Sequence, residues 1–415
     1  MINARVLEAF GIFIAFALWV GCGGSSSSSS GSSSSSSGTG ASSTQTIATS
    51  GPNVASITVN GGPDPSLNYS DAAFTSVTVC VPGTTTCQTI DGILVDTGSS
   101  GLRILSSVLT VPLPQQNSSS GSPVAECFPF VSGYAWGPVQ TADVEMASEK
   151  ASSVPIQVLS DSDFTAPSSC ADTGPSSDTL ASLGANGIVG VGLFAQDCGT
   201  YCEQVQTAPG NLNLYYECTS ATSCQAIGES LAQQVPNPVS LFSTDNNGVI
   251  IELPAVSGGE APSVSGSLVF GIGTGSNNAL GAATVYTANA SGNFTTTYSG
   301  AVDSASFIDS GSNGYFFPST TITVCPSNSD APDFYCPSST ENLSASNQGA
   351  NGASGTVNFS IANAETLFSV DDFAYSELGG TYSSDAFDWG LPFFFGRNVY
   401  TGIQNSTNLY GYWAY

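Results

Sequence analysis

Short apolar runs, broken by Gly, Ser, Asn and Pro, recur along most of this chain. Runs rich in Val, Ile, Thr, Phe and Tyr predict strands, for example at 54–59, 154–159 and 266–271. No long stretch keeps the apolar period of about 3.6 residues that marks an amphipathic helix. The pattern therefore predicts a mostly β protein.

Length and linker composition predict that the folded part has two halves. At roughly 100–200 residues per domain, a chain of 415 residues has room for two domains or one bilobal unit. A stretch rich in Gly, Pro and Ser at 253–266 separates two strand-rich regions. We place an N-terminal lobe at 51–245 and a C-terminal lobe at 246–415.

The first residues resemble an export signal. Arg5 is followed by an apolar stretch at 10–20, which is too short to favour a membrane-spanning helix and fits a secretory signal peptide at 1–21. Gly21-Cys22 is similar to the cleavage site of bacterial lipoproteins, in which the cysteine carries the lipid. We predict lipidation at Cys22, with ordinary signal-peptide cleavage as the alternative.

The next segment predicts a tether. Residues 23–44 are almost wholly Ser and Gly and hold no core-forming residues, so we assign 22–50 to a lipidated, flexible tether. Such a tether would hold a folded domain at the bacterial outer membrane or cell surface, and the N-terminal lipid is the only membrane contact that we expect. A periplasmic or secreted protein is the alternative.

Charge and composition exclude several classes of function. The chain has no histidine, which removes imidazole-based catalysis and the usual His-bearing zinc sites. With only four basic residues, it is a poor partner for nucleic acid. The net charge of −27 favours solubility and is also compatible with work in acid, where carboxylates become protonated.

Ten cysteines follow Cys22, and an even number in an exported chain indicates disulfides. Spacing does not determine their connectivity, and a metal site is the rival interpretation, although we expect neither metal nor cofactor. Eight of the cysteines are close neighbours in sequence and two would remain to pair: Cys80 and Cys87, Cys198 and Cys202, Cys218 and Cys224, Cys325 and Cys336, then Cys127 and Cys170.

Two short motifs carry the candidate chemistry. Asp-Thr-Gly-Ser-Ser at 96–100 and Asp-Ser-Gly-Ser at 309–312 each follow a hydrophobic run that predicts a strand. Two carboxylates on tight glycine turns at strand ends, one in each half, suggest a pair that meets across a pseudo-two-fold axis. A third copy, Asp-Thr-Gly at 172–174, has no strand before it and is followed by Pro175, so it predicts a plain turn.

Over nearly all of 51–415, these features resemble the pepsin-like, two-lobed aspartic peptidases. In that family, each lobe has a hydrophobic-hydrophobic-Asp-Thr/Ser-Gly turn that crosses a later hydrophobic-hydrophobic-Gly segment. The matching segments are 94–98 with 188–190 and, less cleanly, 307–311 with 389–392. The resemblance implies an all-β bilobal fold, with two related β-barrel-like lobes and an active-site cleft between them. We expect the nearest relatives to be uncharacterised bacterial exported lipoproteins with the same motifs.

The resemblance also implies roles for individual residues. Asp96 and Asp309 would share a proton and activate a water molecule for attack on a peptide carbonyl, without a covalent intermediate, metal or cofactor. Tyr134 is the candidate for the flap tyrosine above the substrate, and an aromatic residue packed on the sheet is the alternative. Residues beside the aspartates would support them through hydroxyls and backbone amides: Thr97, Gly98, Ser99, Ser310, Gly311 and Ser312.

Three positions depart from the family pattern. Arg103 stands where a tryptophan usually bonds the flap tyrosine, and its cation would either lower the pKa of the dyad or pair with a nearby carboxylate. Pro392 falls where a glycine is expected, and the flap sequence at 134–137 is Tyr-Ala-Trp-Gly.

The function that we predict is a surface-tethered, monomeric aspartic endopeptidase that acts on polypeptides. The alternative is a catalytically inactive pepsin-like lipoprotein that binds peptides or glycans, since a fold alone does not establish activity. A structural surface protein would make the doubled motif a coincidence. A homodimeric, retroviral-type peptidase is disfavoured because one chain already carries both half-sites.

Overall fold

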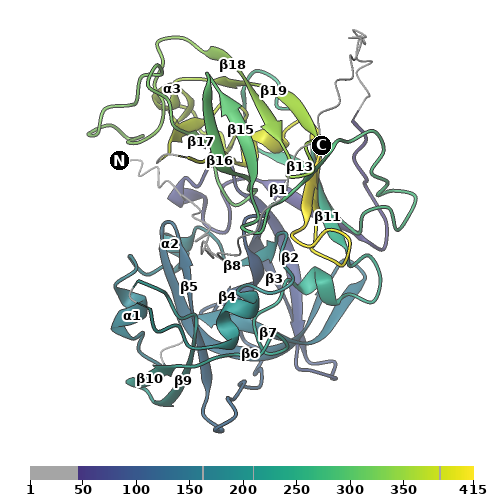
Figure 1. Cartoon of the computed structure of the whole chain (residues 1–415), viewed down its shortest axis with the longest axis vertical. Helices are drawn as coiled ribbons and strands as arrows, with labels where there is room; N and C mark the ends of the chain where they lie inside the picture. The colour runs from purple at the N-terminus through teal and green to yellow at the C-terminus, as the bar shows by residue number, and fades with distance from the viewer. Residues whose placement is uncertain (1–44, 161–162, 209, 383–384) are drawn as a thin grey trace, which may run out of the picture.

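The computed structural model describes residues 45–160, 163–208, 210–382 and 385–415 (Figure 1). The predicted signal peptide, the predicted lipidation site Cys22 and the predicted tether up to residue 44 lie outside the described residues. No helix in the described part of the chain combines the length and the apolar character needed to cross a bilayer.

Strands dominate the described residues, as the apolar pattern predicts. The helices are single turns: α1 (Ser168–Ala171), α2 (Leu180–Leu183) and α3 (Ala364–Leu367), with the 3₁₀ turns η1 (Pro65–Leu67), η2 (Gly199–Glu203), η3 (Pro238–Leu241) and η4 (Leu391–Phe394). The fold class is therefore all-β, as predicted.

The longest sheet of the described chain runs through both halves. Its strands, in spatial order, are β10 (Ser223–Ala226), β9 (Tyr215–Ser220), β5 (Val124–Phe130), β6 (Gly133–Met146), β7 (Glu149–Leu159), β4 (Ser100–Leu105), β8 (Gly187–Val191), β3 (Cys87–Asp96), β2 (Ala73–Cys80), β1 (Val54–Val59), β13 (Val264–Phe270), β11 (Gly248–Leu253), β23 (Arg397–Gly402), β24 (Tyr412–Ala414) and β14 (Val285–Thr287).

Pairing of β6 with β2 closes part of this sheet into a barrel. The circuit β2-β3-β8-β4-β7-β6 returns to β2 through Val79 opposite Val144. Apolar side chains from these strands, among them Val77, Val95 and Ile104, are buried inside. This barrel lies within the predicted N-terminal lobe, in the lower half of Figure 1.

The second half forms another sheet, in the upper part of Figure 1. Its order is β19 (Ser354–Ile361), β18 (Glu341–Gln348), β15 (Phe294–Tyr298), β16 (Ala301–Ile308), β22 (Asp388–Trp389), β17 (Tyr315–Phe317) and β21 (Gly379–Thr381), and a small pair joins β12 (Glu260–Ala261) to β20 (Ala374–Tyr375). Aromatic rings fill its core: Phe387 stacks between Phe317, at 4.6 Å, and Trp389, at 4.1 Å.

Antiparallel pairing of β1 with β13 joins the two halves. Val54 lies opposite Val269 and Val59 opposite Val264, so β1, the first strand of the described residues, extends a sheet from the second half. The described end of the predicted tether also packs here, because the Gln45 amide donates to the carbonyl of Leu253 at 2.9 Å.

Five disulfides engage the ten cysteines after Cys22. They are Cys80–Cys87, Cys127–Cys170, Cys198–Cys202, Cys218–Cys224 and Cys325–Cys336. Each close neighbour in sequence pairs with its neighbour, and the remaining two cysteines pair across 43 positions.

Candidate active site

Two strand crossings place the aspartate turns. Strand β3 runs parallel to β8 and ends at Asp96, opposite Gly190. The chain then turns and returns as β4, antiparallel to the other side of β8. In the second half, β16 runs parallel to β22, and β17 lies antiparallel on its other side. The two crossing elements predicted in the first lobe therefore form, and the second lobe repeats them.

The second crossing also has a glycine where two backbone segments approach closely, and this glycine is Gly390. The backbone amide of Asp309 donates to the carbonyl of Trp389 at 3.0 Å, which places Gly390 beside the aspartate turn. A Cβ on Gly390 would lie 2.1 Å from the carbonyl oxygen of Gly314, so no larger residue fits. Pro392 lies in the following η4 turn. The expectation that Pro392 replaces the glycine is therefore wrong by two positions.

The true departure in this crossing is Asp388. It lies opposite Phe307 in the pairing of β22 with β16, whereas Ile188 occupies the matching place of the first crossing. Asp388 is fully buried. Sequence analysis missed this third carboxyl group near Asp309, although the Asp-Trp-Gly triplet at 388–390 was a usable signal.

The two turns interlock through Thr97 and Ser310. The amide of Thr97 donates to Ser310 Oγ at 3.1 Å, and the amide of Ser310 donates to Thr97 Oγ1 at 2.9 Å. Each hydroxyl then donates to the carbonyl before the opposite aspartate, Thr97 to Ile308 at 3.1 Å and Ser310 to Val95 at 2.7 Å. All four bonds cross between the two halves and hold the aspartates at a fixed separation.

Backbone amides hold the inner oxygens of the two carboxyl groups. The Gly98 amide donates to Asp96 Oδ1 at 2.7 Å and to Asp309 Oδ1 at 3.1 Å, so one N–H contacts both. The Gly311 amide donates to Asp309 Oδ1 at 2.8 Å. A Cβ on Gly98 would lie 2.5 Å from Asp309 Oδ2, which explains why the turn needs glycine.

Serine hydroxyls hold the outer oxygens. Ser99 Oγ donates to Asp96 Oδ2, and Ser312 Oγ donates to Asp309 Oδ2 at 3.1 Å. The structure thus brings together both aspartates and all six predicted supporting residues.

Burial raises the pKa of Asp309 well above its usual range. The neighbouring carboxylates of Asp96 and Asp388 raise it further, and the Gly311 amide opposes the shift. Burial and the neighbouring carboxylates therefore favour a neutral form of Asp309.

A cleft of about 460 Å³ opens beside the two aspartates. Its N-terminal wall comes from the tip of the β5–β6 hairpin, at 128–130, and from residues between 192 and 201. The other wall includes Leu409, Tyr410 and Trp413. The lining is mostly apolar, with the aspartates at its base.

Tyr134 does not reach this cleft. It pairs with Pro129 across the hairpin and packs beside Cys127 and Trp136, on the opposite face from Phe128. Side chains alternate along a strand, so this register turns the tyrosine away from the aspartates. The assignment of Tyr134 as the residue above the substrate is therefore corrected to its alternative, and Phe128 and Phe130 line the cleft instead.

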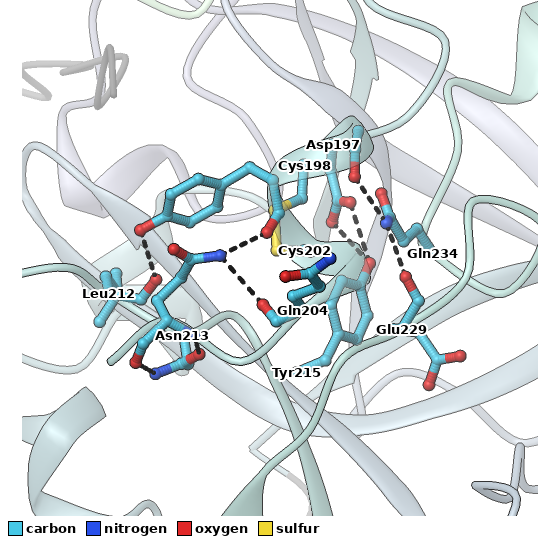
Figure 2. Close-up of a disulfide and its surroundings, with 12 residues drawn as sticks. Asp197, Cys198, Cys202, Gln204, Leu212, Asn213, Tyr215, Glu229 and Gln234 are labelled. Atoms are coloured by element: carbon cyan, nitrogen blue, oxygen red, sulfur yellow. Dashed lines mark hydrogen bonds between the residues drawn. A yellow bond between two sulfur atoms is a disulfide. The ribbon is translucent and has the colours of Figure 1, made fainter. Parts of the chain in front are cut away.

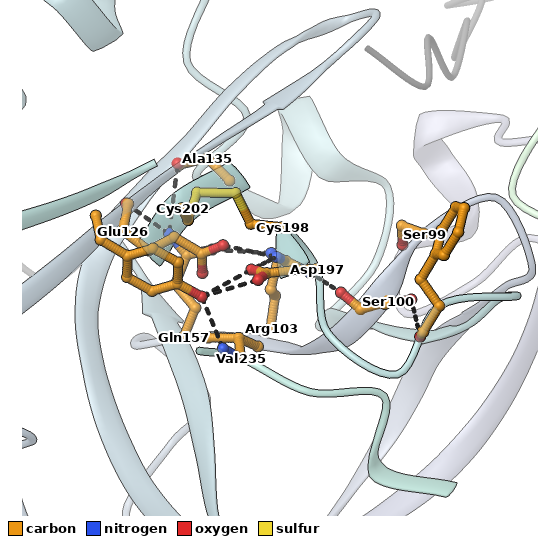
Figure 3. A network of polar contacts seen from close by, with 12 residues as sticks. Ser99, Ser100, Arg103, Glu126, Ala135, Gln157, Asp197, Cys198, Cys202 and Val235 are labelled. Atoms are coloured by element: carbon orange, nitrogen blue, oxygen red, sulfur yellow. Dashed lines mark hydrogen bonds and ion pairs between the residues drawn. A yellow bond between two sulfur atoms is a disulfide. The ribbon is translucent and has the colours of Figure 1, made fainter. Parts of the chain in front are cut away.

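Arg103 is fully buried behind the cleft wall (Figure 3). Its guanidinium pairs with Glu126 at 2.8 Å and with Asp197 at 3.1 Å. Of the two alternatives for its cation, the structure shows pairing with nearby carboxylates. The third motif copy is an exposed turn, since Asp172 caps the end of α1 at the surface.

The strand crossings, the interlock and the paired carboxyl groups define a pepsin-like, two-lobed fold. The chain belongs to the family described as "Protein of unknown function (DUF3443)", whose model matches residues 49–415. Comparison with curated proteins finds no match. A solved structure similar to this chain is the aspartic proteinase from Irpex lacteus, at 15% identity and a TM-score of 0.45, covering 87% of this chain and 96% of that one. Similarity this low carries no argument about activity, and the prediction of lipoprotein relatives stays a prediction.

Proposed function

We propose that this protein is an aspartic endopeptidase that hydrolyses peptide bonds with a water molecule activated between Asp96 and Asp309. The observation that carries this proposal is the single Gly98 amide that contacts both inner carboxyl oxygens. Two carboxyl groups this close do not both ionise readily, so one retains a proton near the working pH.

The surroundings of the two aspartates favour different roles for them, with Asp309 as the general acid and Asp96 as the general base. Asp309, whose pKa is raised by burial, donates its proton to the carbonyl oxygen of the peptide. Asp96 accepts a proton from the water as the water oxygen bonds to the carbonyl carbon. The tetrahedral diol then collapses as the C–N bond breaks: the amine nitrogen takes the proton held by Asp96, and one diol hydroxyl returns a proton to the Asp309 carboxylate. The products are a carboxylic acid and an amine, and the dyad regains its starting state. Ser99 stabilises the charged form of Asp96 through its hydrogen bond.

The cleft fits a polypeptide substrate. Apolar side chains dominate its walls, and the aspartates lie at its base with polar backbone around them. Such a lining suits an extended chain with apolar residues near the cleaved bond. Both aspartates come from one chain, so a monomer suffices for the reaction.

Proteolysis of an unfolded protein from pH 3 to 7, with and without pepstatin, tests the proposal. The variants Asp96→Asn and Asp309→Asn should lose cleavage that the wild-type protein shows in acid. Asp172→Asn is the matched control, because it changes the same residue type in an Asp-Thr-Gly turn at the surface. No cleavage by folded, disulfide-bonded wild-type protein across several substrates would favour the inactive binding module.

We also propose that a lipid at Cys22 tethers the protein to a membrane surface. The support is the Gly21-Cys22 sequence and the Ser/Gly-rich segment after it. Partitioning of the full chain into a detergent phase should be lost in Cys22→Ser. Equal partitioning of the wild-type and Cys22→Ser proteins would contradict the anchor.

A further inference from the structure

The buried Arg103 guanidinium contacts four segments of the N-terminal lobe. It donates to the Ser100 carbonyl at 2.8 Å, just after the first aspartate turn, and to Gln157 Oε1 at 3.0 Å on β7. It also donates to Glu126 Oε1 at 2.8 Å on β5 and to Asp197 Oδ2 at 3.1 Å. Figure 3 shows these side chains converging on Arg103.

Two of these segments form the cleft wall. Glu126 lies two residues before Phe128, and the Arg103 carbon Cζ lies 3.6 Å from the centre of the Phe128 ring. Phe128 lines the cleft together with Asp96 and Asp309, and the Arg103 cation packs against the face of the Phe128 ring. The Gln157 amide also donates to the Glu126 carbonyl at 2.8 Å, which fixes the hairpin backbone.

Asp197 links Arg103 to the other part of the wall. Figure 2 shows Asp197 with Tyr215 and the nearby Cys198–Cys202 disulfide. The Tyr215 hydroxyl donates to Asp197 Oδ1 at 2.9 Å and accepts from the Val235 amide at 2.7 Å. Immediately after Asp197, the Cys198–Cys202 disulfide closes a small ring along the cleft. Movement of Asp197 would therefore move this ring.

The side chains of Arg103, Glu126 and Asp197 have no exposed surface, although Asp197 belongs to a segment that lines the cleft. Burial, followed by the adjacent Glu126, raises the pKa of Asp197 well above its usual range, while Arg103 lowers it. The Arg103 cation thus lies between two buried acids, which partly compensates the cost of burying it.

We propose that Arg103 is a positioning residue for substrate binding, which fixes Phe128 and the 197–202 segment as a preformed apolar subsite beside Asp96. This inference rests on the proposed function. Arg103 positions the cleft wall and takes no part in proton transfer, because its carboxylate contacts are Glu126 and Asp197 and not the two catalytic aspartates.

Steady-state kinetics on full-length Arg103→Lys test the inference. Lysine keeps the charge but lacks the planar fork that serves several acceptors at once. For a peptide with Phe at the cleaved bond, KM should rise about tenfold while kcat stays within about twofold, the signature of lost uniform binding. A purely structural role would instead lower the amount of active enzyme and leave KM unchanged. Arg397→Lys is the matched control, since Arg397 also stacks on a ring, Phe393, at 4.6 Å, outside the cleft lining.

If Arg103→Lys does not fold, the double variant Arg103→Met/Glu126→Gln replaces it in the test. This variant removes a buried cation and a buried anion together, so the net charge of the buried cluster does not change. It should show the same rise in KM. Hydrogen exchange provides a readout without activity: amides of 124–130 and 197–206 should exchange faster in both Arg103 variants than in wild type or Arg397→Lys. An active wild type with unchanged KM and exchange in these variants would overturn the inference. A wild type that cleaves nothing refutes the proposed function, whereas the exchange pattern still decides whether Arg103 holds the wall.

Discussion

Removing one hydroxyl of the Thr97–Ser310 interlock should lower the free energy of unfolding far more than removing a surface hydroxyl. Ser310→Ala leaves the Thr97 amide without its acceptor at 3.1 Å and the Val95 carbonyl without its donor at 2.7 Å. Ser310 is fully buried and Thr97 is 2% exposed, so water does not replace these partners. At about 1–3 kcal/mol for each of these two buried groups left unpaired, the loss in unfolding free energy should be about 2–6 kcal/mol.

Denaturant unfolding with intact disulfides measures this loss. Thr84→Val is the control, because the exposed Thr84 hydroxyl also bonds a carbonyl, Val81 at 2.9 Å, and its removal should cost within about 0.5 kcal/mol. The double variant Thr97→Val/Ser310→Ala should cost about the sum of the single variants, because each hydroxyl serves backbone groups that the other does not. A Ser310→Ala protein as stable as Thr84→Val would refute the claim that the interlock holds the two aspartate turns together.

Three further predictions concern buried acids and a disulfide. Asp388→Asn removes a carboxylate that raises the pKa of Asp309, so the loss of kcat/KM on raising the pH should begin at lower pH. Asp71 lies between the lobes and accepts from the Tyr375 amide at 2.7 Å, and burial raises its pKa. A raised pKa gives stability in acid that is lost as pH rises through the folded value, so Asp71→Asn should lose less stability between pH 4 and pH 7, as measured by unfolding at each pH. Replacing both Cys127 and Cys170 by alanine opens a separation of 43 residues and should cost about 4 kcal/mol in unfolding free energy.

Matched controls separate these effects from general damage. Asp172→Asn, at the surface, should leave both pH profiles unchanged. Removal of the Cys80–Cys87 bridge, with a separation of 7, should cost only about 2.4 kcal/mol by the same loop-entropy relation. The first prediction is contradicted if the pH profile of kcat/KM does not shift in Asp388→Asn. The second is contradicted if the stability of Asp71→Asn depends on pH as in wild type, and the third if removal of either disulfide costs the same unfolding free energy.

Much of the candidate site was predictable because its residues are adjacent in sequence. A strand, an aspartate and a glycine turn are local features, and their repetition pointed to Asp96 and Asp309 with their neighbours. The second crossing was harder to locate in the sequence, because Asp388 occupies a position where a hydrophobic residue was expected. The expected glycine was therefore placed at Pro392 instead of at Gly390. Tyr134 was misplaced for a different reason: a one-position change in hairpin register exchanges the two faces of a strand.

By itself, the sequence determined the all-β class, the two aspartate turns and the even number of cysteines after Cys22, since these depend on local pattern and composition. Only the tertiary structure decided which side chains meet across long separations. Arg103, Glu126 and Asp197 converge through the packing of different strands and loops, and no local pattern encodes that contact. The same holds for Asp388 beside Asp309, because desolvation and neighbouring charge arise only when the lobe closes around them.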